Sequence, residues 1–310
     1  MPGAREDVNP TQEELPVTLT RRRILLLLSA LAQASASMFA ASAPRAAADE
    51  GVRASSPAAD PKGRATTQRY VIVNADDFGE SPGVNRGIIE AHERGIVTSA
   101  SLLLDRPATD AAVALARQTP GLSLGLHANL DRIGAGLIGQ ERFTVLDREI
   151  ERQFNAFTAL TGTSPTHIDS HHHVHRQLNV ARLFLTLSER YGIPLRGFSD
   201  VVYLGGFYGQ WDASKPDQSH ISVDYLLALS SKAGPGFTEI GCHPGYADVA
   251  TDAGYSWQRE IELRSLVDPR AKAGLAAMGI RLVNYRDYRT IVGVAATRSG
   301  VADCRPTMAR

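Results

Sequence analysis

The segment THIDSHHHVH, residues 166–175, places five histidines and one aspartate within ten positions. Histidine is the commonest protein ligand for metals, so the cluster indicates metal affinity, although a histidine run alone does not define a site. While the chain stays extended, alternation puts five of these side chains on one face: His167, Asp169, His171, His173 and His175. Alternation does not choose among them. His171 lies nearest the end of the predicted strand, and we expect it to be the most rigidly placed ligand.

The other members of the cluster have different expected roles. Asp169 is a candidate to orient a ligand imidazole, because metal-bound histidines usually donate their second N–H to such a group. His173 and His175 lie farther into the following loop. Each is interpreted as a substrate contact, a partner of a ligand, or an ordinary surface residue.

Further polar residues follow three other apolar runs. Asp76 and Asp77 follow YVIVNA, His127 lies in LGLHANL, and His243 lies in GCHPG. One of two adjacent aspartates can bind a cation while the other serves as a base. The simpler interpretations are that the pair caps the helix beginning near Pro82, and that His127 is a buried hydrogen-bonded residue. Convergence with the histidine cluster favours a metal site.

The elements that would position these residues alternate along residues 69–291. Short aliphatic runs at 70–75, 97–104, 122–130, 165–171, 193–200, 237–243 and 280–288 predict strands. Amphipathic segments at 82–95, 108–121, 148–162, 179–192, 222–234 and 259–279 predict helices, the last interrupted before Pro269. Residues 201–220 are interpreted as a long loop over the site. This alternation predicts an α/β fold, a distorted or incomplete (β/α) barrel with its chemistry at the C-terminal ends of parallel strands.

Composition excludes several classes of protein. The 310 residues are 43% hydrophobic, enough for a proper core, and 33 basic residues balance 33 acidic ones. We therefore expect no nucleic-acid partner. The two cysteines, Cys242 and Cys304, cannot build a disulfide framework or a cysteine zinc site, so any metal must be held by histidine and carboxylate. Composition does not determine the oligomeric state, and a homodimer is one possible state.

The N-terminus carries a targeting pattern. Three arginines, Arg21, Arg22 and Arg23, precede a short apolar stretch and a run of small residues ending at Ala48. We interpret residues 1–48 as a cleaved bacterial export signal of twin-arginine type, 49–68 as a linker and 292–310 as a C-terminal tail. The apolar stretch is well short of the roughly 20 residues of a membrane span, so we expect a periplasmic or secreted protein without a stable membrane anchor. An uncleaved membrane-associated helix or a mitochondrial-type presequence is the alternative.

Five strings occur in an order that resembles a known family: VNADDFG, GIIEAHERGIVTSASLL, GLHANL, THIDSHHHVH and CHPGYAD. From about Arg69 to Tyr288 the chain resembles the YdjC-like carbohydrate deacetylases, which include chitooligosaccharide deacetylases and a branch associated with hopanoid biosynthesis. The resemblance implies a distorted barrel and a divalent metal held by Asp77, His127 and His171. It further implies that Asp76 is the base and that His243 is an acid or a substrate contact.

The implied reaction removes the acetyl group from an N-acetylated sugar, either an oligosaccharide or a glycolipid headgroup. We expect one divalent ion, magnesium or zinc, with manganese or cobalt as alternatives. His173, His175 and Asn129 are expected to contact the substrate. A non-catalytic carbohydrate-binding or regulatory barrel is the alternative function, which the presence of both Asp76 and His243 disfavours. A metal phosphoesterase is the third hypothesis, and the lack of a second carboxylate–histidine set counts against it.

Overall fold

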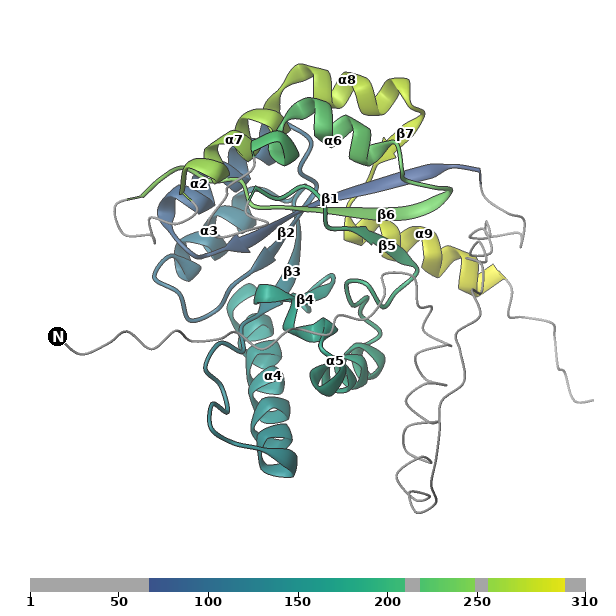
Figure 1. Cartoon of the computed structure of the whole chain (residues 1–310). Helices are drawn as coiled ribbons and strands as arrows, with labels where there is room; N and C mark the ends of the chain where they lie inside the picture. Colours follow the sequence, from purple (N-terminus) through teal and green to yellow (C-terminus); the bar gives the residue numbers. More distant parts are fainter. Residues whose placement is uncertain (1–66, 210–217, 249–255, 299–310) are drawn as a thin grey trace, which may run out of the picture.

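The computed structural model describes residues 67–209, 218–248 and 256–298 (Figure 1). Its strands are β1 (Arg69–Phe78), β2 (Ser99–Leu102), β3 (Ser123–Ala128), β4 (Ile168–Ser170), β5 (Val201–Leu204), β6 (Gly236–Cys242) and β7 (Ile280–Leu282). Every pairing among them is parallel, in the order β4-β3-β2-β1-β6-β5, and β7 pairs with the start of β1. Within the described chain β4 and β5 do not pair, so the sheet is a curled half-barrel. The predicted incomplete barrel is confirmed.

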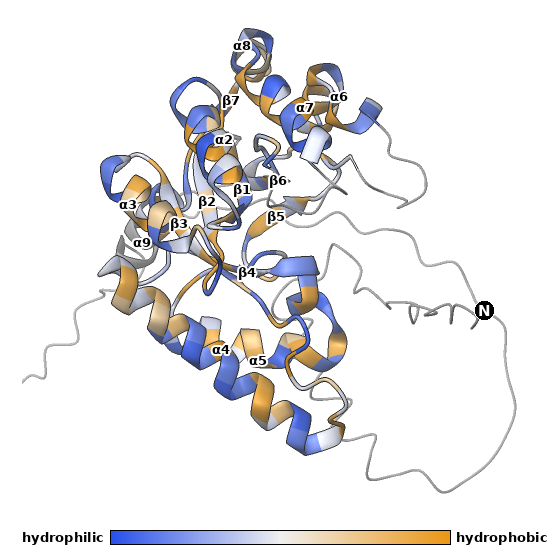
Figure 2. Ribbon diagram, turned by 90° about the vertical axis from the view of Figure 1, so that its left-hand side faces the viewer, coloured by the Kyte–Doolittle hydropathy of each residue, from blue (hydrophilic) through white to orange (hydrophobic). Residues whose placement is uncertain are grey.

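Helices surround this sheet. They are α2 (Pro82–Glu93), α3 (Thr109–Gln118), α4 (Gly139–Thr161), α5 (Leu178–Tyr191), α6 (Val223–Ser230), α7 (Ser256–Val267), α8 (Pro269–Ala277) and α9 (Tyr285–Arg298), with short 3₁₀ helices η1 (His171–Arg176) and η2 (Gln218–Ile221). Figure 2 shows hydrophobic and hydrophilic residues alternating along α4 and α5. The hydrophobic residues that α4 buries recur every three or four positions, as expected for a helix with one packed face: Leu146, Ile150, Phe154 and Phe157.

The helix boundaries follow from local chemistry. Ser81 Oγ accepts a hydrogen bond from the backbone N–H of Val84, and Pro82 occupies the first turn of α2. Asp268 caps α8 by accepting from the N–H of Arg270, and Pro269 follows it. The predicted interruption before Pro269 is therefore the junction between α7 and α8.

The central strand β1 is buried on both faces. Val71, Val73 and Ala75 belong to the main hydrophobic core beneath the helices, whereas Ile72 belongs to a smaller cluster that includes aromatic residues of α9. Asp76 falls on the same face as Ile72, because side chains alternate along a strand. The concave face of the half-barrel is thus apolar near α9 and polar toward the C-terminal ends of the strands.

Two predicted elements differ from the structure. The expected strand at 193–200 is reduced to one isolated bridge between Leu195 and Ile168. The strand lies instead at Val201–Leu204, in the segment interpreted as a loop, where it pairs with β6 and buries Tyr203. That aromatic residue is therefore part of the packed interior. Residues 285–288 begin α9 rather than prolonging the last strand.

Several boundary predictions lie outside the described residues. The expected export signal and nearly all of the linker fall before residue 67, and residues 299–310 of the expected tail are also outside. Helix α9 continues to Arg298, past the predicted boundary at Ile291. Among the described helices, none combines the length and apolar composition needed to cross a bilayer.

Gly87 lies where α2 meets the segment after β6, and it supplies a test of this packing. A Cβ atom at Gly87 would lie 2.5 Å from the Cα of Gly245 and 2.8 Å from its nitrogen, and backbone atoms cannot rotate away. Alanine normally stabilises a helix interior by roughly 0.5–1 kcal/mol relative to glycine. Here we expect Gly87→Ala to lower the free energy of unfolding by about 1–3 kcal/mol in a urea titration. Gly234→Ala is the control, because nothing lies within 4 Å of its added Cβ. Equal stability of Gly87→Ala and wild type would contradict the close approach.

Candidate metal and catalytic site

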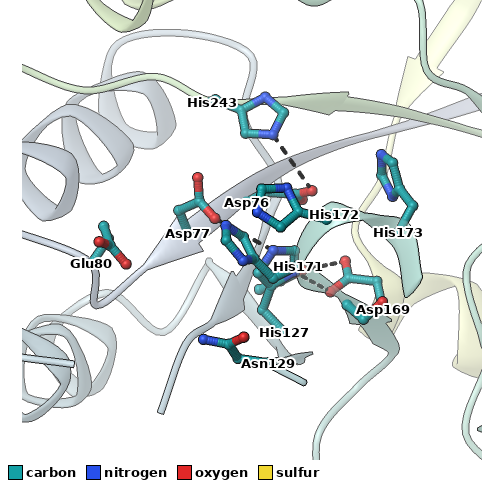
Figure 3. A network of polar contacts seen from close by, with 12 residues as sticks. Asp76, Asp77, Glu80, His127, Asn129, Asp169, His171, His172, His173 and His243 are labelled. Carbon is teal, nitrogen blue, oxygen red and sulfur yellow. Dashed lines mark hydrogen bonds and ion pairs between the residues drawn. The ribbon is translucent and has the colours of Figure 1, made fainter. Parts of the chain in front are cut away.

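The C-terminal ends of four strands bring the predicted polar residues together (Figure 3). Asp76 and Asp77 lie near the end of β1, His127 lies in β3, Asp169 lies in β4, and His243 follows β6. In the sheet register His127 is paired with Asp169. All five residues therefore share one rim, as the alternation of strands and helices predicted.

A bulge at the end of β1 presents both aspartates to the site. The register of β1 against β2 shifts between Ala75 and Phe78, and Asp77 has a φ of 67°. An extra residue in a strand re-aims the side chains around it, and a positive φ is unusual for aspartate. Asp76 and Asp77 can therefore both reach the rim although adjacent strand residues normally face opposite ways.

His127 is fixed between two carboxylates. Its Nδ1 lies 2.6 Å from Asp169 Oδ1, and its Nε2 lies 3.4 Å from Asp77 Oδ1. Burial opposes the charged imidazole, but the carboxylates of Asp169, Asp77 and Asp76 outweigh it and raise the pKa of His127 to about 10. The contact from Asp169 is the one expected of a residue that orients a ligand imidazole.

Asp77 has one oxygen engaged and one available. Its Oδ2 accepts a hydrogen bond of 2.6 Å from Arg259 Nη2, whereas its buried Oδ1 lies 3.4 Å from His127 Nε2 and accepts no well-formed hydrogen bond among the described residues. Burial raises the pKa of a carboxyl, but Arg259 and the nearby histidines hold the pKa of Asp77 well below its usual value. A buried carboxylate oxygen without a well-formed hydrogen bond is costly unless a cation fills that role.

Asp76 is held differently. Arg196 binds both of its oxygens, with Nη1 2.7 Å from Oδ2 and Nη2 2.7 Å from Oδ1, and Asn74 donates to Oδ1 at 2.9 Å. Burial opposes ionisation of Asp76, but the Arg196 guanidinium lowers its pKa below the usual value. His243 Nε2 lies 3.9 Å from Asp76 Oδ2. Asp76 is therefore an oriented, ionised carboxylate that faces a second titratable group.

Arg196 organises a buried charge cluster that sequence reasoning missed. The fully buried guanidinium lies 2.7 Å from Asp169 Oδ2 and donates from Nε to Glu239 at 2.8 Å. Its carbon Cζ lies 4.9 Å from the centre of the Tyr203 ring. The available signal was a single charged residue inside the apolar segment IPLRGF, because arginine is almost never fully buried unless it is paired.

The histidine cluster changes conformation at Ser170. Strand β4 ends there, and η1 begins at His171, with φ of 52° at both His172 and His173. The predicted alternation of faces therefore holds only through Ser170. The left-handed backbone at two consecutive histidines turns their side chains in directions that an extended chain would not give.

His171 lies beside His127. The two ring centres are 5.9 Å apart with an interplanar angle of 72°, and Figure 3 shows both rings close to Asp77. His171 Nδ1 lies 2.7 Å from Asp131 Oδ2. Asp131 was not singled out from the sequence.

The three expected substrate contacts occupy different surroundings. His175 is fully buried, and its Nδ1 hydrogen-bonds Ser170 Oγ at 2.7 Å, an arrangement that supports η1 rather than a contact with a sugar. His173 lies nearer the site, with Nε2 3.4 Å from Tyr203 Oη. Asn129 uses its side-chain oxygen to accept the backbone N–H of Asp131 at 2.9 Å. Direct substrate contact by these residues stays a prediction.

His243 is the remaining titratable group of the rim. Its backbone N–H donates to Glu262, and its ring centre lies 5.2 Å from that of Tyr208. Burial lowers the pKa of His243 to about 4, although the carboxylates of Asp76 and Asp77 oppose this shift. The imidazole is therefore neutral near pH 7.

The donors of Asp77, His127 and His171 are of the types that bind a divalent cation, and this ligand set stays a prediction. Asp77 offers a buried oxygen without a well-formed hydrogen bond, and both imidazoles have a carboxylate at Nδ1. Among the described residues, two groups have ligand atoms that all lie within 4.8 Å of one another: Asp76, His127 and Asp169, and Asp131, His171 and His172. Asp77, His127 and His171 do not form such a group. The group of Asp76, His127 and Asp169 already surrounds the Arg196 guanidinium, which would repel a cation.

Comparison with known proteins identifies the family. Residues 70–277 match the family model of the YdjC-like protein. This chain belongs to the YdjC-like family. It is 37% identical over 251 residues to a carbohydrate deacetylase of Geobacillus stearothermophilus, an alignment that covers 71% of this chain and 98% of that protein. It is 33% identical over 257 residues to a chitooligosaccharide deacetylase of Serratia marcescens, covering 71% and 99%. The resemblance drawn from the sequence motifs is confirmed.

A solved structure agrees with the fold of this YdjC-like chain. The crystal structure of a protein of Enterococcus faecalis V583, proposed to cleave cellobiose phosphate, has a TM-score of 0.60 and 29% sequence identity. The match covers 71% of this chain and 99% of that chain. The half-barrel described here is therefore similar to the fold of that solved structure.

Proposed function

We propose that this YdjC-like protein is a metal-dependent hydrolase that removes the acetyl group from an N-acetylated sugar, either an oligosaccharide or a glycolipid headgroup. The observation that carries the proposal is the different environment of two adjacent aspartates. Asp77 directs a buried oxygen without a well-formed hydrogen bond toward His127, whereas Asp76 is held ionised by Arg196. One carboxylate is thus suited to bind an ion and the other to accept a proton.

A divalent ion held by Asp77, His127 and His171 would polarise the amide carbonyl and acidify a water molecule. Asp76 would accept a proton from that water at a carboxylate oxygen. His243 Nε2 lies 3.9 Å from Asp76 Oδ2, which is longer than a hydrogen bond, so one bridging water would carry the proton from Asp76 to the imidazole, which would pass it to the departing nitrogen. Water adds to the carbonyl carbon, the C–N bond breaks, and the products are acetate and the free amino sugar. Magnesium and zinc are the first candidates, and manganese and cobalt are the alternatives.

Two further observations support the substrate class and the site of action. The alignments cover 98% and 99% of the two deacetylase relatives, so the similarity extends over almost the whole of each relative. The arginine-led apolar segment within residues 1–48 supports export, which would place the sugar in the periplasm or outside the cell. We therefore include N-acetylated glycolipids among the substrates to test.

Removal of the metal tests this function directly. Acetate release is measured from N-acetylglucosamine oligomers and N-acetylated glycolipids, before and after dialysis against a chelator, with magnesium, zinc, manganese or cobalt then restored singly. We expect chelation to lower the rate by roughly 100-fold or more, because the ion supplies several kcal/mol of charge stabilisation, and one metal to restore it. A rate unaffected by chelation would overturn the metal mechanism. Tight sugar binding without acetate release would support the non-catalytic barrel, and phosphate release from sugar phosphates would support the phosphoesterase.

A further inference from the structure

We propose that Asp131 is a positioning residue that fixes His171 for metal binding through Nε2. The proposal rests on the metal site proposed above and assigns no catalytic role to Asp131. The residue lies between β3 and α4, and its carboxylate contacts His171 at the start of η1. Asp131 contacts the His171 imidazole in the same way that Asp169 contacts the His127 imidazole.

The contact geometry selects one form of the imidazole. Asp131 Oδ2 lies 2.7 Å from His171 Nδ1, and Asp169 Oδ1 lies 2.6 Å from His127 Nδ1. A neutral imidazole carries one N–H, and a carboxylate acceptor at Nδ1 retains that hydrogen there. The lone pair is then on Nε2, which leaves this atom as the metal-binding nitrogen. The carboxylate also restricts rotation of the ring.

Asp131 is itself held in place by the chain around it. Its backbone N–H donates to Asn129 Oδ1 at 2.9 Å. Both backbone groups of Asn129 are bonded to the Gln153 side chain of α4, its N–H at 2.9 Å and its carbonyl at 2.6 Å. Gln153 is buried. A turn anchored to a helix of the scaffold thus carries Asp131, even though 35% of the Asp131 side chain is exposed.

The competing arrangement has Asp131, His171 and His172 binding one ion as three ligands. Two ligands of one ion at about 2.1 Å each are separated by roughly 3 Å or more. The 2.7 Å between Asp131 and His171 Nδ1 fits a shared hydrogen better than a shared ion. His172 Nε2 is 4.0 Å from the same carboxylate oxygen, and its side chain is 67% exposed. The geometry therefore favours the supporting role of Asp131.

Metal affinity in the absence of substrate tests the inference. Binding of cobalt and of zinc to the purified protein is measured by calorimetry and chelator competition for wild type, Asp131→Ala, Asp131→Asn, His172→Ala and the control Asp147→Ala, an exposed acidic position on α4. We expect Asp131→Ala to weaken binding by about 10–100-fold and Asp131→Asn by less, because the amide oxygen still accepts the N–H. His172→Ala and Asp147→Ala should bind as wild type does. The visible absorption of the saturated cobalt form should be alike in Asp131→Ala and wild type, because the ligand set is unchanged.

Each contrary outcome has a definite meaning. Unchanged affinity in Asp131→Ala would overturn the inference. Equal losses in Asp131→Ala and His172→Ala, together with a changed cobalt spectrum, would make Asp131 a ligand and would also overturn it. A wild-type protein that binds no metal would remove the proposed metal mechanism and this inference together. Affinities in the expected order without acetate release from any sugar would leave the inference standing and overturn the proposed reaction alone.

Discussion

Replacing Asp76 by asparagine is expected to lower kcat for acetate release by about 10²–10⁴-fold, the usual contribution of a well-placed base. Asparagine keeps the volume of the side chain but cannot accept the proton from water. The three proposed ligands are untouched, so metal affinity should remain close to that of the wild type. Acetate release under saturating substrate, with metal binding measured by calorimetry on the same preparation, checks both expectations.

Asp77→Asn provides the contrast for this experiment. Both aspartates are buried and each is bonded to an arginine, Asp76 to Arg196 and Asp77 to Arg259. Both substitutions therefore remove one buried negative charge from an ion pair. Only Asp77→Asn should weaken metal binding as well as turnover. Retention of turnover in Asp76→Asn, or an equal loss of metal affinity in the two variants, would contradict the division of roles.

The rim of the site was predictable because its signals are local. Asp76, His127 and His243 each follow or end an apolar run, and parallel strands place such positions at one edge of the sheet. The partnership of Asp169 with the His127 imidazole also follows from a strand position, since β3 and β4 are neighbours and pair His127 with Asp169. Short-range pattern and the parallel arrangement together determine these placements.

The sequence around the residues that hold the rim does not show which groups they bind. Arg196 and Arg259 are 120 and 182 positions away from the aspartates that they bind, and only the folded chain brings them together. The backbone at His172 and His173 turns left-handed, which a rule for extended strands cannot anticipate. Tyr203 lies two residues before a pair of glycines, Gly205 and Gly206, and so resembles loop sequence, yet pairing with β6 buries it beside Arg196. Tertiary contacts override composition in each case.

Replacing Arg196 by methionine is expected to produce the largest loss of stability, about 3–5 kcal/mol in the free energy of unfolding of the metal-free protein. The guanidinium is fully buried and pairs with Asp76, Asp169 and Glu239. Methionine fills much of the same space but leaves these carboxylates buried without their cation. The cost arises from the charges left behind, so it exceeds what the ion pairs themselves contribute to the native protein. A urea titration followed by circular dichroism measures the change.

Arg152→Met is the matched control for Arg196→Met. Arg152 also pairs with carboxylates, those of Glu149 and Asp105, but its side chain is 48% exposed. Water solvates these charges after the substitution, and exposed ion pairs contribute within about 1 kcal/mol. Arg196→Lys separates charge from geometry, because it retains a cation but cannot bind both oxygens of Asp76 at once. We expect its stability to lie between those of wild type and Arg196→Met. If Arg196→Met were no less stable than Arg152→Met, the buried carboxylates would not depend on the guanidinium, and Asp76 would need another source of its charge and orientation.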